Sequence, residues 1–420
     1  MDELQVVEYP MLSKGIFLDA GEQFYIARPV EHLKKWVMDG PFKKNEKQFL
    51  RPCASAPNTG QSFMALEPSP NLFSQGIRAQ IGSDPEVFAA DSNGKLISAV
   101  SWAPAQRTEN ITRDRTQRPT GRLFRDGVAG EFYTYPYSCI AAFVDELACG
   151  LQEAEWRLKS VHPSARLTMK NVFELSPREL DELSDTEVEL GCSPSLSAYG
   201  DPPLGLNGRY VPIRSAGGHI HFGHTPNGTR EDIFLKATKF LDFYLGVPCV
   251  SLAEKIDSPS RRQFYGRAGE YRIQKHGLEY RTLSNFWLCH PAIAQLVLEM
   301  GRAGFDFGVS SPLMLLPFGA IEEARDVINA TDVTGARKML KKYEKHYMKL
   351  LEQCFTGIYV ATAISPDSRT RPKAFELLMN GVHSRVTLDD SLAAHWNLDT
   401  WIYHSERPGA QFASFVSGKT

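Results

Sequence analysis

The pattern of apolar and polar positions changes in character near residue 77. Residues 1–75 are of mixed character, with one helix-like segment at 30–38 and a loop-like stretch rich in Pro, Ser, Asn and Gly at 51–76. Beyond residue 77, strand-like runs alternate with helical ones. The run Asp91-Ser92-Asn93-Gly94 is a hairpin signal between strand-like residues 83–88 and 95–100.

Helical periodicity predicts four longer helices, at 140–158, 229–245, 291–303 and 336–354. The last has an apolar stripe at 4-3-4-3-4 spacing, formed by Ala336, Leu340, Tyr343, Tyr347, Leu350 and Cys354. Helices interspersed with short strands predict an α+β fold, in which a largely antiparallel sheet carries the polar motifs described below.

Composition narrows the class of protein. The 420 residues carry a formal net charge of −2, which provides no strong field for nucleic acid or an anionic membrane. The acidic start does not resemble a signal peptide, and no segment is long and apolar enough to span a membrane. The seven cysteines form no CxxC pair, which favours buried thiols in a reducing compartment. We therefore expect a cytoplasmic protein that binds neither nucleic acid nor membrane.

Four strand-like segments carry polar residues whose side chains should share a face. These pairs are Asp84 with Glu86, Asp126 with Glu131, His219 with His221, and Glu279 with Arg281. Each pair alone has an ordinary explanation, such as a turn, an exposed strand face or a cross-strand ion pair. Together, five carboxylates and one or two histidines suit two oxygen-preferring divalent ions, Mg²⁺ or Mn²⁺, better than they suit zinc.

Arginines are concentrated next to these acidic motifs. Five lie within twenty-one residues: Arg261, Arg262, Arg267, Arg272 and Arg281. The planar guanidinium matches phosphate oxygens and stays charged when desolvated. The chain has neither a GxxxxGK[ST] loop nor a kinase-type glycine loop. Metal-binding carboxylates beside phosphate-binding arginines indicate a phosphoryl-transfer site of another kind.

The order of these motifs resembles the glutamine synthetase superfamily of carboxylate–amine ligases, and especially the phage-encoded amidoligases called COOH–NH2 ligase type 2. Asp84-Pro85-Glu86 resembles the first catalytic strand of the superfamily, and 126–131 resembles its next acidic motif. Gly218-His219-Ile220-His221 resembles its metal-and-phosphate strand. The paired arginines and the closing Glu-x-Arg with a following asparagine are similar to Arg267, Arg272, Glu279, Arg281 and Asn285. The resemblance covers about residues 80–300.

The resemblance implies a role for each motif. One metal would be held by Glu86, Asp126 and Glu131, and the other by Asp84, His219 and Glu279. His221, Arg267, Arg272 and Arg281 would contact the phosphates of ATP and act in catalysis, with Arg262 as a further nucleotide-binding residue. It also implies a glutamine synthetase-like sheet, curved around the site and backed by helices, at 76–310. Residues 1–75 would be an N-terminal extension, and 311–420 a mainly helical region packed on the core.

The implied activity is formation of an amide from a small-molecule or peptide carboxylate and an amine, with ATP and two Mg²⁺ or Mn²⁺ ions. The location would be the host cytoplasm if the chain is phage-encoded. Two alternatives remain open at this stage. One is an ATP-dependent phosphotransferase on the same fold, and the other is a catalytically inert phage binding or virion-associated protein. The sequence identifies neither the acid, the amine nor the oligomeric state.

Overall fold

The fold was analysed in a computed structural model of the chain. The structure describes residues 79–106, 122–134, 136–137, 140–188, 195–203, 207–223, 231–275, 277–311, 313–354, 370–386 and 391–396, and short strands at 9–10, 24–27, 49–51, 62–67, 112–113 and 119–120. The helix-like segment expected at 30–38 lies outside these residues. Among the described strands every pairing is antiparallel.

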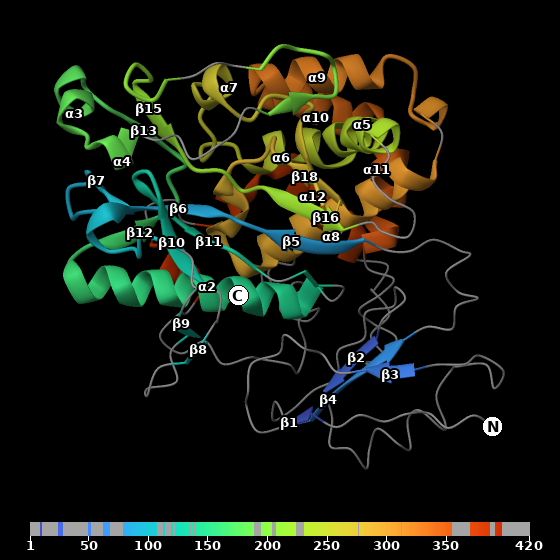
Figure 1. Ribbon diagram of the computed structural model, residues 1–420. Helices are drawn as coiled ribbons and strands as arrows, with labels where there is room; N and C mark the ends of the chain where they lie inside the picture. Colours follow the sequence, from blue (N-terminus) through green and yellow to red (C-terminus); the bar gives the residue numbers. More distant parts are fainter. Residues whose placement is uncertain are drawn as a thin grey trace.

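Two five-stranded sheets form the centre of the molecule (Figure 1). The first has the order β14–β17–β18–β16–β5, with bounds Leu196–Ser197, Glu270–Gln274, Gly277–Tyr280, Ile220–Gly223 and Gln80–Ser83. The second has the order β10–β11–β6–β12, with β7 also paired to β6, and bounds Leu123–Asp126, Ala129–Phe132, Glu86–Ala90, Arg166–Thr168 and Leu96–Ile97.

Smaller strand groups complete the sheet structure. They are β13 with β15 (Val172–Glu174 and Ile213–Ser215), β8 with β9 (Thr112–Arg113 and Pro119–Thr120), and a four-stranded sheet of β1 (Tyr9–Pro10), β2 (Phe24–Ala27), β3 (Phe49–Arg51) and β4 (Ser62–Glu67).

Helices back the sheets. The longer ones are α2 (Ile140–Val161), α5 (Glu231–Leu241), α8 (Pro291–Ser310), α9 (Ala320–Ala330), α10 (Val333–Lys342), α11 (Glu344–Cys354) and α12 (Thr370–Asn380). The shorter ones are α3 (Pro177–Glu182), α4 (Asp185–Val188), α6 (Val247–Leu252), α7 (Arg261–Phe264) and α13 (Leu392–Trp396), with single turns or short non-α segments η2 (Ala99–Ser101), η3 (Asp242–Gly246), η4 (Asn285–Cys289), η5 (Leu313–Leu315) and η6 (Val382–Ser384). The α+β class predicted from the sequence is confirmed.

The first sheet is covered on one face by α5 and α8, which also contact each other. Strand alternation places Ile220 and Phe222 of β16 on this covered face, where the Phe222 ring stacks on Phe305 of α8 at 4.8 Å. Leu278 and Tyr280 of β18 lie opposite them in register. The apolar residues of these strands therefore anchor one face, and the alternate residues must point to the other.

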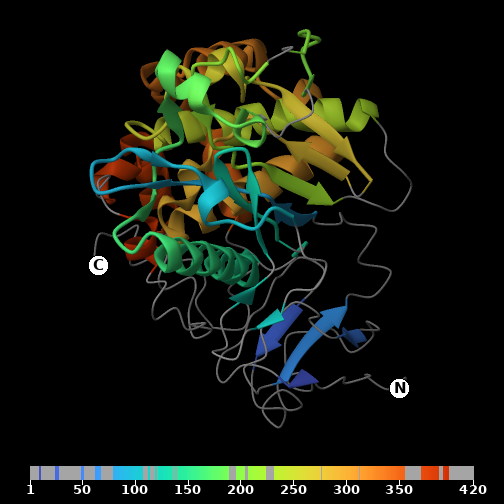
Figure 2. The same cartoon turned by 60° about the vertical axis from the view of Figure 1, so that its left-hand side comes forward.

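The second sheet is flanked by α2, which contacts β12, β10 and β11 and also α8. Figure 2, which is turned by 60° from Figure 1, shows this green helix below the sheets. Leu147, Leu151, Ala154 and Leu158 are fully buried at 4-3-4 spacing, which explains why the periodicity predicted α2 correctly. Strand β6 is buried on both faces. Packing on both faces therefore holds β6 in place, independently of the contacts made by Glu86 at its polar end.

Several of the predicted elements differ from the structure. Residues 62–67, inside the stretch expected to be loop, form β4, and the strand expected at 95–100 is the short β7 followed by the turn η2. The single helix expected at 336–354 is two helices, α10 and α11, because Tyr343 leaves helical geometry at φ −109° and ψ 26°. Both halves still bury the predicted stripe, so the apolar spacing could not reveal the break. The helix expected to end near 245 continues through a π-helical segment, Asp242–Gly246, into α6. The proposed division at residues 75 and 310 stays a prediction.

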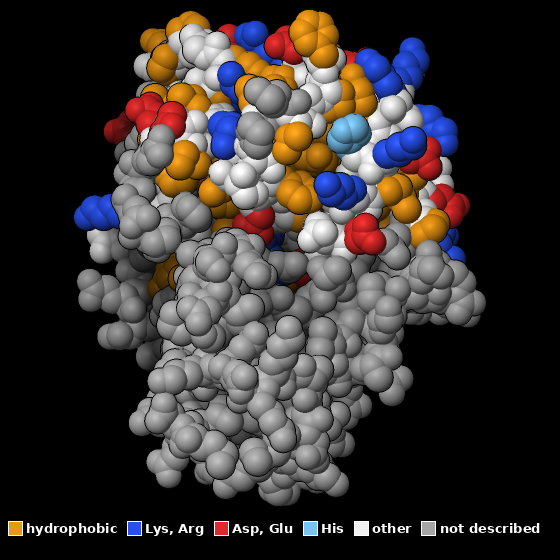
Figure 3. All heavy atoms as spheres, turned by 90° about the vertical axis from the view of Figure 1, so that its right-hand side faces the viewer, with side chains coloured by type: hydrophobic (Ala, Val, Ile, Leu, Met, Phe, Trp, Pro, Cys, Tyr) orange, Lys and Arg blue, Asp and Glu red, His pale blue; other side chains and the backbone are white. Residues whose placement is uncertain are grey.

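The described part of the face in Figure 3 carries acidic and basic side chains interspersed with apolar ones. No region of one sign dominates that part of the face, in keeping with the near-zero net charge. No helix within the described residues is long and apolar enough to cross a membrane.

Gly218, in the loop that enters β16, tests how tightly the first sheet is packed at this end. Its N–H donates to the Leu283 carbonyl at 3.1 Å, and its carbonyl accepts from the Trp287 indole at 3.1 Å. A Cβ here would lie 2.4 Å from the Ser284 carbonyl oxygen. We expect Gly218→Ala to lower the free energy of unfolding by about 1–3 kcal/mol, because backbone must move to admit the methyl group. Urea denaturation measures this, and an unchanged midpoint and slope would contradict the close packing.

Candidate metal and nucleotide site

The two sheets meet at residues 83–86, between the end of β5 and the start of β6. Three hydrogen bonds fix this junction. The Glu86 N–H donates to the Gly217 carbonyl at 3.0 Å, the Ser83 hydroxyl donates to the His219 carbonyl at 2.6 Å, and the Asn285 amide donates to the Glu86 carbonyl at 2.8 Å. The Asp-Pro-Glu motif is therefore held against the Gly-Gly-His motif, as the sequence predicts.

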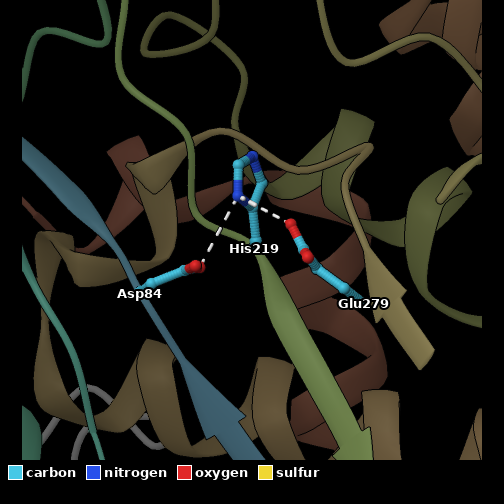
Figure 4. A group of neighbouring side chains, drawn as sticks. All are labelled: Asp84, His219 and Glu279. Carbon is cyan, nitrogen blue, oxygen red and sulfur yellow. Dashed lines mark ion pairs between the residues drawn. The ribbon is translucent and has the colours of Figure 1, made fainter. Parts of the chain in front are cut away.

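One cluster is formed by Asp84, His219 and Glu279, which converge from three strands or their ends (Figure 4). The Nδ1 atom of His219 lies 3.5 Å from an oxygen of Asp84 and 3.5 Å from an oxygen of Glu279. One potential ligand atom from each residue lies within 4.8 Å of the others. His219 and Glu279 are buried and Asp84 is partly buried. The three residues predicted to share one metal thus lie together.

The donor atoms of this cluster fit a divalent ion. The Asp84 and Glu279 oxygens that face the imidazole are both buried. The Asp84 oxygen also lies 3.0 Å from Nε2 of His221, and the Glu279 oxygen lies 3.1 Å from Nε of Arg281. Two buried carboxylates this close together repel each other, and a cation between them would offset that repulsion. Two carboxylate oxygens and one imidazole nitrogen form a ligand set that Mg²⁺ tolerates and Mn²⁺ suits.

The charge state of the cluster also suits a cation. Burial raises the pKa of Asp84, but the imidazoles of His221 and His219 outweigh it and hold that pKa well below its usual value. Burial lowers the pKa of His219, which keeps its imidazole neutral as a ligand must be. For His221, burial is outweighed by the carboxylate of Asp84, 3.0 Å from Nε2, which raises the pKa. Asp84 is therefore an anion that lies between the imidazole of His219, whose pKa is lowered, and the imidazole of His221, whose pKa is raised.

Cross-strand register explains why His221, Glu279 and Arg272 lie in a row. His221 of β16 pairs with Glu279 of β18, which in turn pairs with Arg272 of β17. Residues paired in register point to the same face, here the face opposite α5 and α8. The Arg272 Nε atom lies 3.3 Å from one Glu279 oxygen, and the Arg281 Nε atom lies 3.1 Å from the other. Glu279 is thus the central anion of the site.

The second cluster consists of Glu86, Asp126 and Glu131, whose oxygens also lie within 4.8 Å of one another. Glu86 and Glu131 are direct cross-strand partners, a repulsive arrangement for two ionised groups. Burial, and then the charge of Asp126, raise the pKa of Glu86 to about 8, although the Gly217 N–H donates to its carboxylate at 2.8 Å. A cation bound here would offset both of these effects by stabilising the ionised carboxylates, so the donor set fits a divalent ion here too.

The stretch 126–131 is not the single strand expected from the sequence. It is a hairpin, in which Asp126 ends β10, Gly127 and Val128 form the turn and Ala129 begins β11. Gly127 has φ +56°, which a side chain would disfavour, and glycine at the first position of a two-residue loop is a common hairpin turn. The correction leaves Asp126 and Glu131 together, because the turn folds one strand back onto the other.

The remaining arginines divide into two groups. Arg267 and Arg272 are partly exposed, and Arg267 donates to Glu270 at 2.9 Å and to the Pro202 carbonyl at 3.3 Å. Arg262 is buried, with one terminal nitrogen on the Thr282 carbonyl and the other 3.3 Å from Asp257. Its neighbour Arg261 is also buried and donates to the Thr282 and Leu283 carbonyls. The contacts of Arg262 are those of a structural residue, and its expected nucleotide contact stays a prediction.

Sequence reasoning missed two polar contacts of the site. The Gln274 amide donates to Glu279 at 2.6 Å, and the Tyr265 hydroxyl lies 2.7 Å from Nε2 of His219. Gln274 lies two residues beyond Arg272 in β17 and so shares its face, a spacing that could have indicated it. Tyr265 follows helix α7, and no periodic pattern marks it.

Comparison with known proteins bears on the same segment. Residues 208–303 match the model of a family described as the phage phiEco32-like COOH.NH2 ligase, type 2. The resemblance to these amidoligases is confirmed for this part of the chain. The matched segment contains the histidine pair, the arginines and Glu279, and its description supports the class of carboxylate–amine ligases.

Other comparisons add little to the family match. One solved structure with partial likeness is the bifunctional glutathione synthetase from Pasteurella multocida, with 11% identity over 81% of this chain and 52% of that one, at a TM-score of 0.39. The chain spans about half the length of that enzyme. No curated protein matches the chain.

The raised pKa of Glu86 predicts how stability depends on pH without added metal. Between its ordinary value of 4.5 and about 8, the folded protein holds a proton on Glu86 that the unfolded chain has released. The free energy of unfolding should therefore contain a contribution that is full below pH 4.5 and is lost as pH rises to about 8. Glu86→Gln should remove this contribution, so that the variant loses less stability than the wild type over that range. Urea unfolding at several pH values in a chelator measures the difference.

The exposed Glu182, in α3, provides the control for this experiment. Glu182→Gln should follow the wild-type pH profile. If Glu86→Gln also followed it, the carboxylates would not be crowded enough to retain the proton.

Proposed function

We propose that this protein is an ATP-dependent carboxylate–amine ligase that forms an amide through an acyl phosphate. The observation that carries the proposal is the position of Glu279. Glu279 belongs to one candidate metal cluster, where it lies beside His219, and it also pairs with Arg272 and Arg281. A site that binds a metal–phosphate complex needs cation-binding oxygens and phosphate-binding cations side by side. The family description, a COOH.NH2 ligase, supports the reaction class.

In the proposed reaction, an oxygen of the substrate carboxylate attacks the γ-phosphorus of ATP, and the bond to the β-phosphate oxygen breaks. The products of this step are ADP and an acyl phosphate. The amine then attacks the acyl carbon, loses a proton and expels inorganic phosphate, which leaves the amide. Activation by phosphorylation is needed because an ionised carboxylate does not lose oxide to an amine in water.

The side chains divide this work between them. Asp84, His219 and Glu279 would hold one divalent ion, and Glu86, Asp126 and Glu131 the other. The ions would supply positive charge to the phosphate oxygens and keep the reacting groups in line. Arg272 and Arg281 approach the same face of the sheet and would stabilise charge that develops on the transferred group. His221, beside Asp84, would donate a hydrogen bond to a phosphate oxygen.

Arg267 is assigned to the outer part of the phosphate site. It is partly exposed and is paired with Glu270, so it can reorient toward a ligand at a lower desolvation cost than a fully buried arginine. Arg262 is assigned no direct phosphate contact in this scheme because both of its terminal nitrogens have protein partners.

Metal-dependent binding of a non-hydrolysable ATP analogue is the direct test of the proposed site. Glu131→Gln should retain the fold, since it removes one of three crowded carboxylates. We expect it to weaken Mn²⁺-dependent binding of the analogue by more than about 100-fold, because changes outside the ligand shell alone cost 10–100-fold. Calorimetric titration with and without Mn²⁺ measures this.

The control is again Glu182→Gln, which should bind as the wild type does. Absence of metal-dependent binding in the wild type would refute the nucleotide site. Binding retained by Glu131→Gln would refute only the assignment of this residue to the metal.

Arg281→Lys tests the phosphate role. The side chain is fully buried beside Glu279, so lysine keeps the charge but loses the planar fork. We expect kcat for amine-dependent ATP turnover to fall by about 10³-fold or more, as when an arginine that stabilises the transferred phosphoryl group is lost. The exposed Arg178 of α3 provides the matched control, and Arg178→Lys should leave kcat unchanged. Equal kcat in both variants would contradict the assignment.

Product analysis distinguishes the ligase from a phosphotransferase. A ligase releases ADP and inorganic phosphate in equal amounts when both the acid and the amine are present. A phosphotransferase releases ADP and retains the phosphoryl group on a stable product. Phosphorus NMR of the reaction mixture separates the two outcomes.

A further inference from the structure

Tyr265 lies between a candidate metal ligand, His219, and a candidate phosphate-binding residue, Arg281. Its hydroxyl lies 2.7 Å from Nε2 of His219, and the two rings are 5.5 Å apart and tilted by 59°. The guanidinium of Arg281 lies 5.2 Å from the centre of the same tyrosine ring. One side chain thus contacts both a candidate metal ligand and a candidate phosphate-binding arginine.

The position of Tyr265 is fixed by its surroundings. Its backbone N–H donates to the Arg261 carbonyl at 2.7 Å, which closes the turn of α7. The next residue, Gly266, has φ +75°, and a Cβ there would collide with the Arg261 guanidinium. That guanidinium in turn donates to the Thr282 and Leu283 carbonyls at 3.0 and 2.7 Å. The tyrosine hydroxyl therefore meets the imidazole at a defined place.

The direction of this hydrogen bond decides which imidazole nitrogen can bind a metal. A neutral imidazole carries one N–H, and its other nitrogen offers a lone pair. Nδ1 of His219 faces the carboxylates of Asp84 and Glu279, whereas Nε2 faces Tyr265. A hydrogen bond from Nε2–H to the tyrosine oxygen leaves the Nδ1 lone pair directed at the cluster (Figure 4). The opposite tautomer would direct a proton there instead.

We propose that Tyr265 is a positioning residue, which accepts the Nε2–H of His219 and thereby presents Nδ1 to the metal while its ring holds Arg281. This inference rests on the proposed function, because it presupposes a metal at the Asp84, His219 and Glu279 cluster. A partner of this kind fixes the tautomer and orientation of a ligating histidine. The tyrosine hydroxyl can still donate its own hydrogen elsewhere, so this role leaves it a donor.

Tyr265→Phe removes the hydroxyl and keeps the ring over Arg281. The experiment uses the full chain, in a Glu131→Gln background that disables the second cluster, with Mn²⁺ as the probe. We expect the Mn²⁺ affinity to fall about 10–100-fold, the range for loss of a partner of a metal-bound histidine. Calorimetry measures the affinity, and Tyr210→Phe, at a tyrosine that is 82% exposed, is the control and should bind as its parent does.

A spectroscopic measurement separates positioning from general loosening of the fold. With ¹⁵N-labelled histidine and saturating Mg²⁺, a diamagnetic ion of the same class, the ring nitrogens of His219 should report Nε2–H in the parent, and this tautomer preference should weaken in Tyr265→Phe. His219→Gln identifies the signals. Cooperative unfolding of Tyr265→Phe, followed by circular dichroism, verifies that the variant is folded.

The outcomes distinguish this inference from the proposed function. If the parent binds Mn²⁺ and Tyr265→Phe binds it equally well, with the same tautomer, the positioning role is wrong and the metal site stands. If the parent binds no Mn²⁺, the metal site and the inference both fail. Weaker binding together with a changed tautomer is the result that we expect.

Discussion

Buried negative charge at the junction of the two sheets is the constraint on which the rest of the site depends. Asp84 and Glu86 flank Pro85 in the short link between β5 and β6. Glu131 lies directly opposite Glu86 on the neighbouring strand. Ionised carboxylates taken out of water need compensating charge or hydrogen bonds. The described structure supplies part of this through the Gly217 N–H and the two imidazoles. The raised pKa of Glu86 is the sign that the compensation is incomplete without a cation.

The apolar side of the first sheet makes this concentration of charge possible. Ile220, Phe222, Leu278 and Tyr280 are fully buried on the face covered by α5 and α8. Their burial fixes the register of β16 and β18, since a slip by one residue would expose them and bury His221 and Glu279 in the apolar layer. The same packing that stabilises the fold thus sets the spacing between the candidate metal ligands. On the covered face, Tyr280 also donates to Asp242 at 2.7 Å, which ties the strand to the π-helical segment.

The sequence carried more information about the site than about the boundaries of its elements. Two-residue spacing in strands predicted that His219 and His221, and Glu279 and Arg281, would act together, and the structure brings all four to one region. The six candidate ligands form the two predicted groups of three, although their role as ligands stays a prediction. By contrast, the hairpin at 126–131 depends on a positive φ at Gly127, and the break at Tyr343 leaves the apolar stripe intact. Neither event changes the polar–apolar pattern, so periodicity alone could not reveal them.

Arg262 and Tyr265 show where residue type alone is an inadequate guide. Arg262 was grouped with phosphate-binding arginines because it lies beside them in the sequence, yet its terminal nitrogens contact the Thr282 carbonyl and Asp257. Tyr265 has no charge and follows no period, yet it contacts His219 and Arg281. Both outcomes follow from the path of α7 and the residue after it. Arg261 and Arg262 of α7 turn inward onto the 282–283 carbonyls, and Tyr265, which follows the helix, contacts His219 of the cluster. A guanidinium that satisfies buried backbone carbonyls stabilises the loop that carries the tyrosine. The buried Arg261 and Arg262 therefore hold the loop that carries Tyr265, whereas Arg281, which is also buried, and Arg272, which is partly exposed, lie beside Glu279.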